Sequence, residues 1–228
     1  FIVDDIETSM SHVNFKEVAS SSAAYALRDA FDAGVIAEMF AGVSSSSPDH
    51  VIGSDSSTAD ATLAHATNSV DLLGSDGTGV DALDLMARMA RTLDEQNVPE
   101  EGRWFVASPD FYEVLGQASS KLLSVDFNAG QGSIRNGLVA SGQLRGFSMY
   151  KSTNVPTNDL SGATPAGSAT APEALFGHIS ATSAASAMNK VETVRDTSTF
   201  SDIVRGLMVW GRKVLRTDAV GKIIYVID

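Results

Sequence analysis

Cysteine is absent from this 228-residue chain. The absence excludes disulfide frameworks, thiolate zinc sites, iron–sulfur clusters and cysteine nucleophiles. No window approaches about 18 uninterrupted apolar residues, so the sequence predicts no transmembrane helix. Basic residues are also scarce, because 16 lysines and arginines stand against 28 aspartates and glutamates and give a net charge of −12. A non-specific nucleic-acid binder needs a field of the opposite sign, so the charge argues against direct DNA or RNA binding.

The remaining composition is that of a folded, acidic protein. Apolar residues make up 43% of the chain, and a chain of this length can bury about 70% of its unfolded surface. It therefore needs neither a disulfide nor a metal ion to hold a core. The length fits one large domain or two small ones. The chain opens inside an apolar strand pattern, from Phe1 to Ile6, which leads us to expect that a further segment precedes it.

Helices are predicted mainly in the first half of the chain and strands mainly in the second. Three- and four-residue spacing of apolar residues predicts a long helix over 16–42; these residues are Leu27, Phe31, Val35, Ile36, Met39 and Phe40. A second amphipathic helix is predicted over 80–97, and Ser108 as N-cap and Pro109 in the first turn predict a third. Strands are predicted at residues 1–6, 103–107, 146–151, 174–180, 190–195, 203–216 and 220–227. This order indicates an α+β fold and not a βαβ alternation.

The segment between the first two helices carries no clear chemistry. Residues 43–79 are rich in serine, aspartate and glycine, and we expect a surface linker there. The histidines lack metal-ligand spacing, and we expect His50 and His65 at the surface; the four histidines are His12, His50, His65 and His178. The aspartates within residues 71–84 lack the alternation and the closing glutamate of an EF-hand, which favours a solvated helix start. The sequence predicts no metal and no cofactor.

One glycine run allows a second interpretation. Residues 74–79 (GSDGTG) run into a helix and could form either a structural turn or a phosphate-binding loop. The run lacks the Lys-Ser/Thr ending of a Walker loop, which favours the turn. No GxSxG nucleophile motif is present, and the sequence predicts no catalytic residue. A small α+β enzyme or ligand-binding domain with its site near residues 74–79 stays as the weaker alternative.

Basic residues become more frequent toward the C-terminal end of the chain. The candidates for a shared surface are Arg205, Arg212, Lys213 and Arg216. They could form a solvated sheet face, a salt-bridge surface that meets acidic residues of another copy, or a nucleic-acid contact. The last interpretation is the weakest, because few aromatic residues lie between them to stack on bases.

Four segments, in this order and spacing, resemble one protein family. They are residues 1–6 (FIVDDI), 93–112 (LDEQNVPEEGRWFVASPDFY), 146–156 (GFSMYKSTNVP) and 191–216 (VETVRDTSTFSDIVRGLMVWGRKVLR). The second and fourth segments are the more specific. Together they resemble the major capsid proteins of tailed bacteriophages, which have the Hong Kong 97 capsid fold.

The resemblance implies a domain plan. Residues 16–42 would form the long spine helix within 1–79, the first part of a peripheral domain. Residues 80–182 would form the axial domain, and residues 183–228 would complete the peripheral domain. Family members place an N-terminal arm and an extended loop before the strand matched by residues 1–6, and this sequence has neither. The glycine-rich stretch 116–145 and the loop 157–172 would let the axial domain adapt to five-fold and six-fold rings.

The resemblance also implies a function. The protein would be no enzyme but a structural protein of the virion that assembles with itself, in the host cytoplasm, into the hexamers and pentamers of an icosahedral head. The shell would enclose double-stranded DNA without sequence-specific binding and without a membrane, and portal, scaffold and cement proteins are possible partners. Arg205, Arg212, Lys213 and Arg216 would then form contacts between subunits. An encapsulin-type nanocompartment shell is the alternative with the same fold.

Overall fold

The chain divides into two compact units. The computed structural model describes residues 2–4, 15–43, 50–53, 59–60, 69–72, 79–116, 143–159 and 170–227. Unit 1 comprises Phe1–Val35 and Ser183–Lys213, and unit 2 comprises Ile36–Thr182 and Val214–Asp228. The glycine run 74–79, apart from Gly79, and most of the stretches 116–145 and 157–172 lie outside the described residues.

This division differs from the domain boundaries drawn from the sequence. Those boundaries place residues 36–79 and 214–228 with the two ends of the chain, whereas the structure groups them with residues 80–182. The reason is strand pairing across long sequence distances. The strand β12 (Val220–Val226) pairs with β2 (Val51–Ile52) and β4 (Ser69–Asp71) in parallel, and it pairs with β9 (Thr170–His178) antiparallel.

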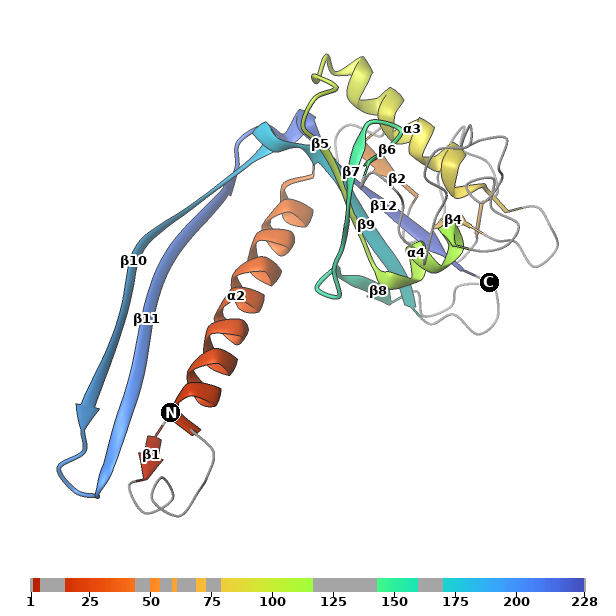
Figure 1. The fold of residues 1–228 in the computed structure, drawn as a ribbon. Coiled ribbons are helices and arrows are strands. Elements are labelled where there is room, and N and C mark those ends of the chain that lie inside the picture. Colours follow the sequence, from red (N-terminus) through yellow and green to blue (C-terminus); the bar gives the residue numbers. More distant parts are fainter. Residues whose placement is uncertain are drawn as a thin grey trace, which may run out of the picture. The chain divides into compact units, whose positions relative to one another are not determined.

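Unit 1 combines most of one long helix with a three-stranded sheet. The helix α2 spans Phe15–Gly42, which confirms the helix predicted over 16–42. The sheet has the order β1-β11-β10, with bounds β1 (Ile2–Asp4), β10 (Thr182–Arg195) and β11 (Ser201–Val214). Strands β10 and β11 form a long hairpin, and the short β1 pairs antiparallel with the start of β11. The helix lies beside this hairpin around Phe31, whose ring meets that of Trp210 (Figure 1).

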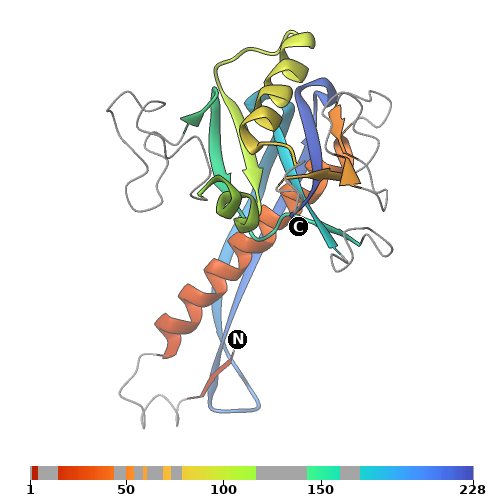
Figure 2. The ribbon, with the colours of Figure 1, turned by 90° about the vertical axis from the view of Figure 1, so that its right-hand side faces the viewer.

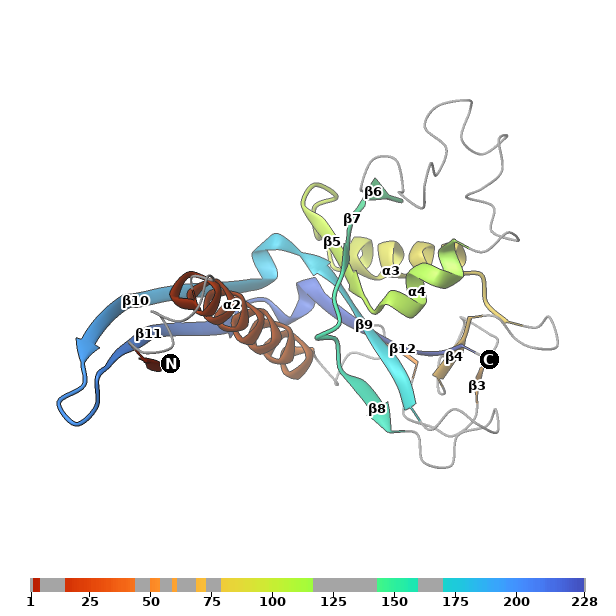
Figure 3. The same cartoon turned by 60° about the horizontal axis from the view of Figure 1, so that its bottom comes forward.

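Unit 2 is built on a mixed sheet. Its main path runs β3-β4-β12-β9-β5-β7-β6, with β2 beside β12 and β8 beside β9. The remaining bounds are β3 (Ala59–Asp60), β5 (Arg103–Ala107), β6 (Gln143–Leu144), β7 (Phe147–Lys151) and β8 (Thr157–Asp159). Two helices, α3 (Ala82–Glu95) and α4 (Pro109–Leu115), lie on one face of this sheet (Figures 2 and 3). Two single turns, η3 (Ile179–Ala181) and η4 (Thr217–Ala219), complete it.

The core of unit 2 joins this sheet to its helices. Asp81 caps α3 by accepting a hydrogen bond from the Leu83 N–H at 3.0 Å, as expected for an acidic helix start. Apolar residues at helical spacing then bury one face of α3. Phe111 of α4 packs against aromatic rings of two strands. Its ring centroid lies 4.9 Å from that of Phe105 in β5 and 5.5 Å from that of Tyr225 in β12. Aromatic pairs at such distances add about 0.5–1.5 kcal/mol to simple burial.

Two expectations about the linker are wrong. The segment 43–79 does not lie wholly on the surface, because Ile52, Val70 and Leu72 are buried in the core of unit 2. His50 is buried as well, and its Nδ1 donates a hydrogen bond to the Val220 carbonyl at 2.9 Å. Pairing with β12 explains both corrections, since a short polar segment becomes core when it adds a strand to a central sheet.

Candidate assembly surface

The β10–β11 hairpin presents two different faces. Trp210 meets Phe31 of α2 edge-to-face with ring centroids 6.0 Å apart. Two residues further along β11, the guanidinium of Arg212 occupies the space that a side chain at Gly34 would need. Successive strand residues point to opposite sides, so the even-numbered residues at this end of β11 face α2. A larger residue at position 34 would therefore displace the guanidinium of Arg212.

The odd-numbered residues of β11 form the opposite surface, which we call the outer face. It consists of Arg205, Leu207, Val209, Gly211 and Lys213. Leu207 is 54% exposed and Val209 is 45% exposed. Arg205 forms an ion pair across the strands with Glu192 of β10. The outer face thus carries apolar side chains between two cationic positions, and the described residues of unit 1 leave these side chains exposed.

The hairpin ends in an ordered turn. The carboxylate of Asp196 accepts hydrogen bonds from the Thr199 hydroxyl at 2.6 Å and from the N–H and hydroxyl of Ser198. These bonds, with the Thr199 hydroxyl first, lower the pKa of Asp196 below its ordinary 3.8, because they favour the ionised form. The turn leaves Phe200 80% exposed. A large aromatic side chain held in water by a fixed turn is a candidate contact residue.

A row of residues on α2 is also exposed. Val18, Tyr25 and Asp32 follow one another at intervals of seven residues, so they lie along one side of the helix. We call them the outer row. Tyr25 is 75% exposed and Val18 is 56% exposed. The row points away from the hairpin, because Phe31 and Gly34, which face the hairpin, lie on the other side of the helix.

The structure does not bring the four predicted basic residues to one surface. Arg205 and Lys213 lie on the outer face, whereas Arg212 faces α2. Arg216 belongs to unit 2 and pairs with Asp218 at 2.7 Å. This hydrogen bond raises the pKa of Arg216 and lowers the pKa of Asp218. Two of the four cations therefore already have a carboxylate partner in their own chain, and their role between subunits stays a prediction.

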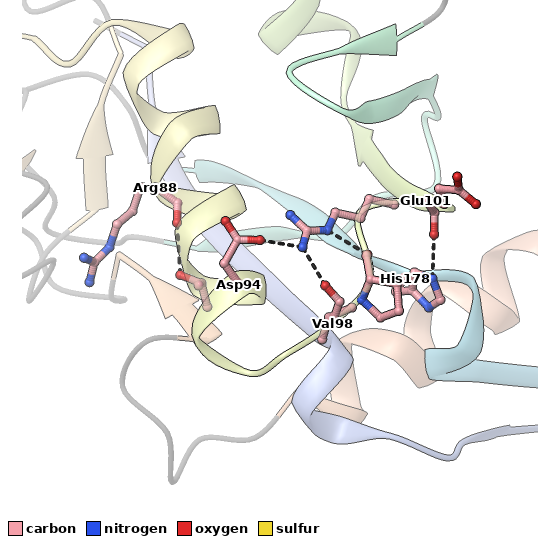
Figure 4. Close-up of polar contacts among 8 residues, drawn as sticks. Arg88, Asp94, Val98, Glu101 and His178 are labelled. Atoms are coloured by element: carbon pink, nitrogen blue, oxygen red, sulfur yellow. Dashed lines mark hydrogen bonds and ion pairs between the residues drawn. The ribbon is translucent and has the colours of Figure 1, made fainter.

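A buried polar cluster in unit 2 was not predicted (Figure 4). Arg103, only 4% exposed, donates to the Asp94 carboxylate and to the Val98 carbonyl, both at 2.6 Å, and to the Pro99 carbonyl at 3.0 Å. These bonds fix the connection between α3 and β5. The planar guanidinium suits this task because it offers several donors in one rigid fork. The cluster is a structural clamp, since Nε and one terminal nitrogen of the guanidinium bond to the chain on the α3 side of β5.

His178 extends the same clamp. Its Nε2 donates to the Glu101 carbonyl at 2.7 Å, and its Nδ1 accepts from the Ser180 N–H at 3.1 Å and lies 2.8 Å from the Ser180 hydroxyl. The ring thus ties the loop before β5 to the turn η3. Sequence reasoning missed this role, because a lone histidine without a spaced partner has no pattern that predicts a contact 77 residues away.

Two tyrosines of unit 2 have raised pKa values; Tyr225 is buried and Tyr112 is half-buried. Burial raises the pKa of Tyr225 to about 12, and its hydroxyl lies 2.7 Å from that of Ser108. Ser108 stands at the N-cap position of α4 but makes no side-chain capping bond, so the cap predicted from the sequence is wrong in this detail. Burial also raises the pKa of Tyr112 to about 12. Its hydroxyl has no hydrogen-bond partner among the described residues.

The described part of the chain shows no metal-binding or membrane-spanning feature. No group of three or more histidine, aspartate or glutamate side chains there could hold a metal ion. No helix in the same residues is long and apolar enough to cross a bilayer. The alternative site at residues 74–79 lies outside the described residues except for Gly79. The surface that stands out is therefore that of unit 1.

Comparison with known proteins decides which family has this architecture. The sequence model of a family described as phage capsid protein matches residues 14–223. This chain belongs to the phage capsid protein family. The resemblance seen in the four sequence segments is confirmed, and so is the α+β fold of the Hong Kong 97 type. The chain is a major capsid protein of the tailed-phage kind, a structural protein of the virion shell.

Solved structures agree with this assignment. The capsid protein is similar to a chain of Mycobacterium phage Che8, with a TM-score of 0.71 and 28% identity over 99% of this chain and 68% of that chain. It is similar to a chain in the capsid structure of Cyanophage P-SCSP1u, with a TM-score of 0.65 and 20% identity over 100% and 71%. The SrpI encapsulin of Synechococcus elongatus PCC 7942 has a TM-score of 0.56 and 12% identity over 98% and 70%, which shows the fold alone. No curated protein matches the sequence.

Proposed function

We propose that this capsid protein is the repeated tile of an icosahedral head, that its copies form hexamers and pentamers, and that the closed shell encloses double-stranded DNA. The observation that carries the proposal is the surface of unit 1. Tyr25, Phe200, Leu207 and Val209 are all exposed there. Apolar surface of this extent marks a region that another protein covers. Heterologous contacts between identical copies close into rings, which is what a shell requires.

Charge supports the same arrangement. We propose that Arg205, Arg212, Lys213 and Arg216 contact acidic residues of neighbouring copies. The chain carries a net charge of −12, so its few cations are the natural partners for the acidic surface of the next copy. Each exposed ion pair contributes only about 0–1 kcal/mol. Because the same pair recurs between all neighbouring copies, the summed contribution to the stability of the shell is large.

The acidic balance also suits the contents of a head. DNA is held by proteins through cations that neutralise phosphates, and a wall of negative subunits would not hold it tightly. We therefore propose containment without sequence-specific binding. Portal, scaffold and cement proteins are the partners that such a head would use, its assembly would take place in the host cytoplasm, and the tile itself would catalyse no reaction.

Particle formation tests the proposal directly. The expressed protein is separated by size-exclusion chromatography and imaged by negative-stain electron microscopy. Megadalton particles with five-fold and six-fold rings are expected, and nuclease-protected DNA is expected in particles from infected cells. A protein that stays monomeric under all assembly conditions would overturn the proposal. Particles filled with a cargo enzyme instead of DNA would favour the encapsulin alternative.

Charge reversal tests the basic residues. Glutamate at both Arg212 and Arg216, or at both Arg205 and Lys213, should reduce the yield of particles at low salt. The matched control is Lys151→Glu, which removes an exposed cation of unit 2. Circular dichroism establishes that each variant is folded. Normal assembly of both double variants at low salt would contradict the proposed contacts.

A further inference from the structure

Among the described residues of unit 1, the outer row of α2 and the outer face of the hairpin both carry exposed apolar side chains. The outer row places two exposed apolar side chains, Val18 and Tyr25, before the acidic Asp32. The outer face places two exposed apolar side chains, Leu207 and Val209, before the cationic Lys213. The outer face also carries Arg205 at its other end, where this residue pairs with Glu192. At the ends formed by Asp32 and Lys213, the two surfaces carry charges of opposite sign.

We propose that the outer row of α2 in one copy packs against the outer face of the β10–β11 hairpin in a neighbouring copy. In this contact Asp32 pairs with Lys213, Tyr25 lies over Val209 and Gly211, and Val18 meets Leu207. The inference rests on the proposed function, because it names the partner surfaces by which one tile joins the next.

The spacing of the two surfaces matches. A helix rises about 1.5 Å per residue, so Tyr25 and Val18 lie about 10 Å and 21 Å from Asp32 along α2. A strand rises about 3.3 Å per residue, so Val209 and Leu207 lie about 13 Å and 20 Å from Lys213 along β11. The charged and apolar positions thus come into register along the whole contact.

Gly211 provides the space that an aromatic ring needs. A side chain at this position would meet nothing within 4 Å among the described residues, so the strand is bare there between Val209 and Lys213. A tyrosine ring from another copy can cover this gap and bury the backbone of β11. Aromatic side chains stabilise sheet glycines in this way, and Tyr residues are frequent contact anchors at protein interfaces.

The contact must be between copies. The even-numbered residues of β11 face α2 in the same chain, as Trp210 and Arg212 show, and the outer face points to the other side. The outer row likewise points away from its own hairpin. The two surfaces are therefore different patches on one molecule, and a contact between them is heterologous, which propagates around a ring. Asp32 in the outer row also makes nucleic acid a poor occupant of the helix surface.

Disulfide trapping tests the contact, and the natural absence of cysteine makes the result unambiguous. Tyr25→Cys and Val209→Cys are made as two separate single variants and are co-assembled into particles. Mild oxidation of the mixed particles should give a covalent dimer as the main product on a non-reducing gel, whereas particles of either variant alone should give none. The matched control pairs Tyr25→Cys with Tyr150→Cys, an exposed position of unit 2, and should give no dimer.

A charge swap provides a second measurement. Asp32→Lys should raise the critical concentration for assembly by about tenfold, and Lys213→Asp in the same chain should restore it. Normal particles without the mixed dimer, together with no rescue by the swap, would overturn this contact and leave the proposed function standing. Failure of the unaltered protein to form particles would instead overturn the proposed function itself.

Discussion

The two units of this capsid protein differ in where they keep their apolar side chains. Among the side chains that the structure describes, every buried hydrophobic residue belongs to unit 2, including Phe105, Phe176 and Tyr225. Among the described residues of unit 1, the only buried one is polar, Ser201. Most of the large exposed apolar residues belong to unit 1 instead: Ile2, Val18, Tyr25, Leu27, Val191, Val194, Phe200, Leu207 and Val209.

This difference indicates how the two units gain stability. Unit 2 buries enough apolar surface to hold its own core, because burial contributes about 25 cal/mol per Å². Unit 1 leaves comparable side chains in water, so part of its stabilisation must come from whatever covers them. Binding to the folded state alone stabilises that state. The comparison therefore predicts a rigid unit 2 in the free subunit and a unit 1 that becomes more stable on assembly.

The largest expected effect is the loss of a core aromatic residue in unit 2. Phe105→Ala should cost about 3–5 kcal/mol, whereas Phe31→Ala, which removes a partly exposed contact with Trp210, should cost about 1 kcal/mol in the free subunit. The chain has two tryptophans, Trp104 in unit 2 and Trp210 in unit 1. Urea unfolding of single-tryptophan variants therefore follows each unit by fluorescence. Equal losses for the two alanine variants would refute the comparison.

Alkaline pH should lower the stability of unit 2 and leave that of unit 1 unchanged. Burial raises the pKa of Tyr225 from 10.0 to about 12. A raised folded pKa means that the stabilisation is complete below pH 10 and is lost as the pH rises through about 12. A pKa raised from 10.0 to about 12 corresponds to about 2–3 kcal/mol. Burial also raises the pKa of Tyr112 to about 12, so this residue contributes in the same direction.

Urea midpoints measured between pH 9 and pH 11.5 check this prediction. The midpoints reported by Trp104 fluorescence should fall as the pH rises, and Tyr225→Phe should make this fall shallower. At neutral pH the same variant should lose about 1 kcal/mol of unfolding free energy, because its hydrogen bond with Ser108 is gone. The control is Tyr25→Phe, because Tyr25 is exposed in unit 1 and its substitution should leave the decline unchanged. A decline of the same slope in Tyr225→Phe would show that this tyrosine is not its cause.

Local sequence patterns predicted the parts of the fold that depend on neighbouring residues. The helix 16–42 and the strand 103–107 agree with α2 and β5, because each has its own apolar periodicity or a continuous buried run. The strands within residues 43–79 were missed, because only pairing with β12 makes them core. The first half of β10 was also missed, since residues 182–189 are rich in serine and alanine, which have low strand propensity.

The candidate surface was predictable only in part. The basic residues were identified by composition, but strand alternation places Arg205 and Lys213 on one side of β11 and Arg212 on the other. The alternation of odd and even positions can be seen in the sequence, so it could have separated Arg212 from Arg205 and Lys213 before the structure was known. The exposure of Phe200 and Tyr25 could not be predicted, because a solitary aromatic residue has the same pattern in a core and at an interface.

The smallest expected effect is a loss of local stability in acid at the turn that ends the hairpin of unit 1. Hydrogen bonds, first from the Thr199 hydroxyl and then from Ser198, lower the pKa of Asp196 below 3.8. A lowered folded pKa means that the stabilisation is present above pH 3.8 and is lost as the pH falls through the folded value. The turn should therefore loosen locally in acid without unfolding unit 2.

Hydrogen-exchange mass spectrometry can detect this loosening in a peptide that covers the turn. After correction for the intrinsic exchange rate, protection of the Ser198 amide should be lower at pH 2.5 than at pH 5. Asp196→Asn has no carboxylate to titrate and should show the same protection at both values. If the unaltered protein behaved as this variant does, the carboxylate would not hold the turn, and the exposed position of Phe200 would need another cause.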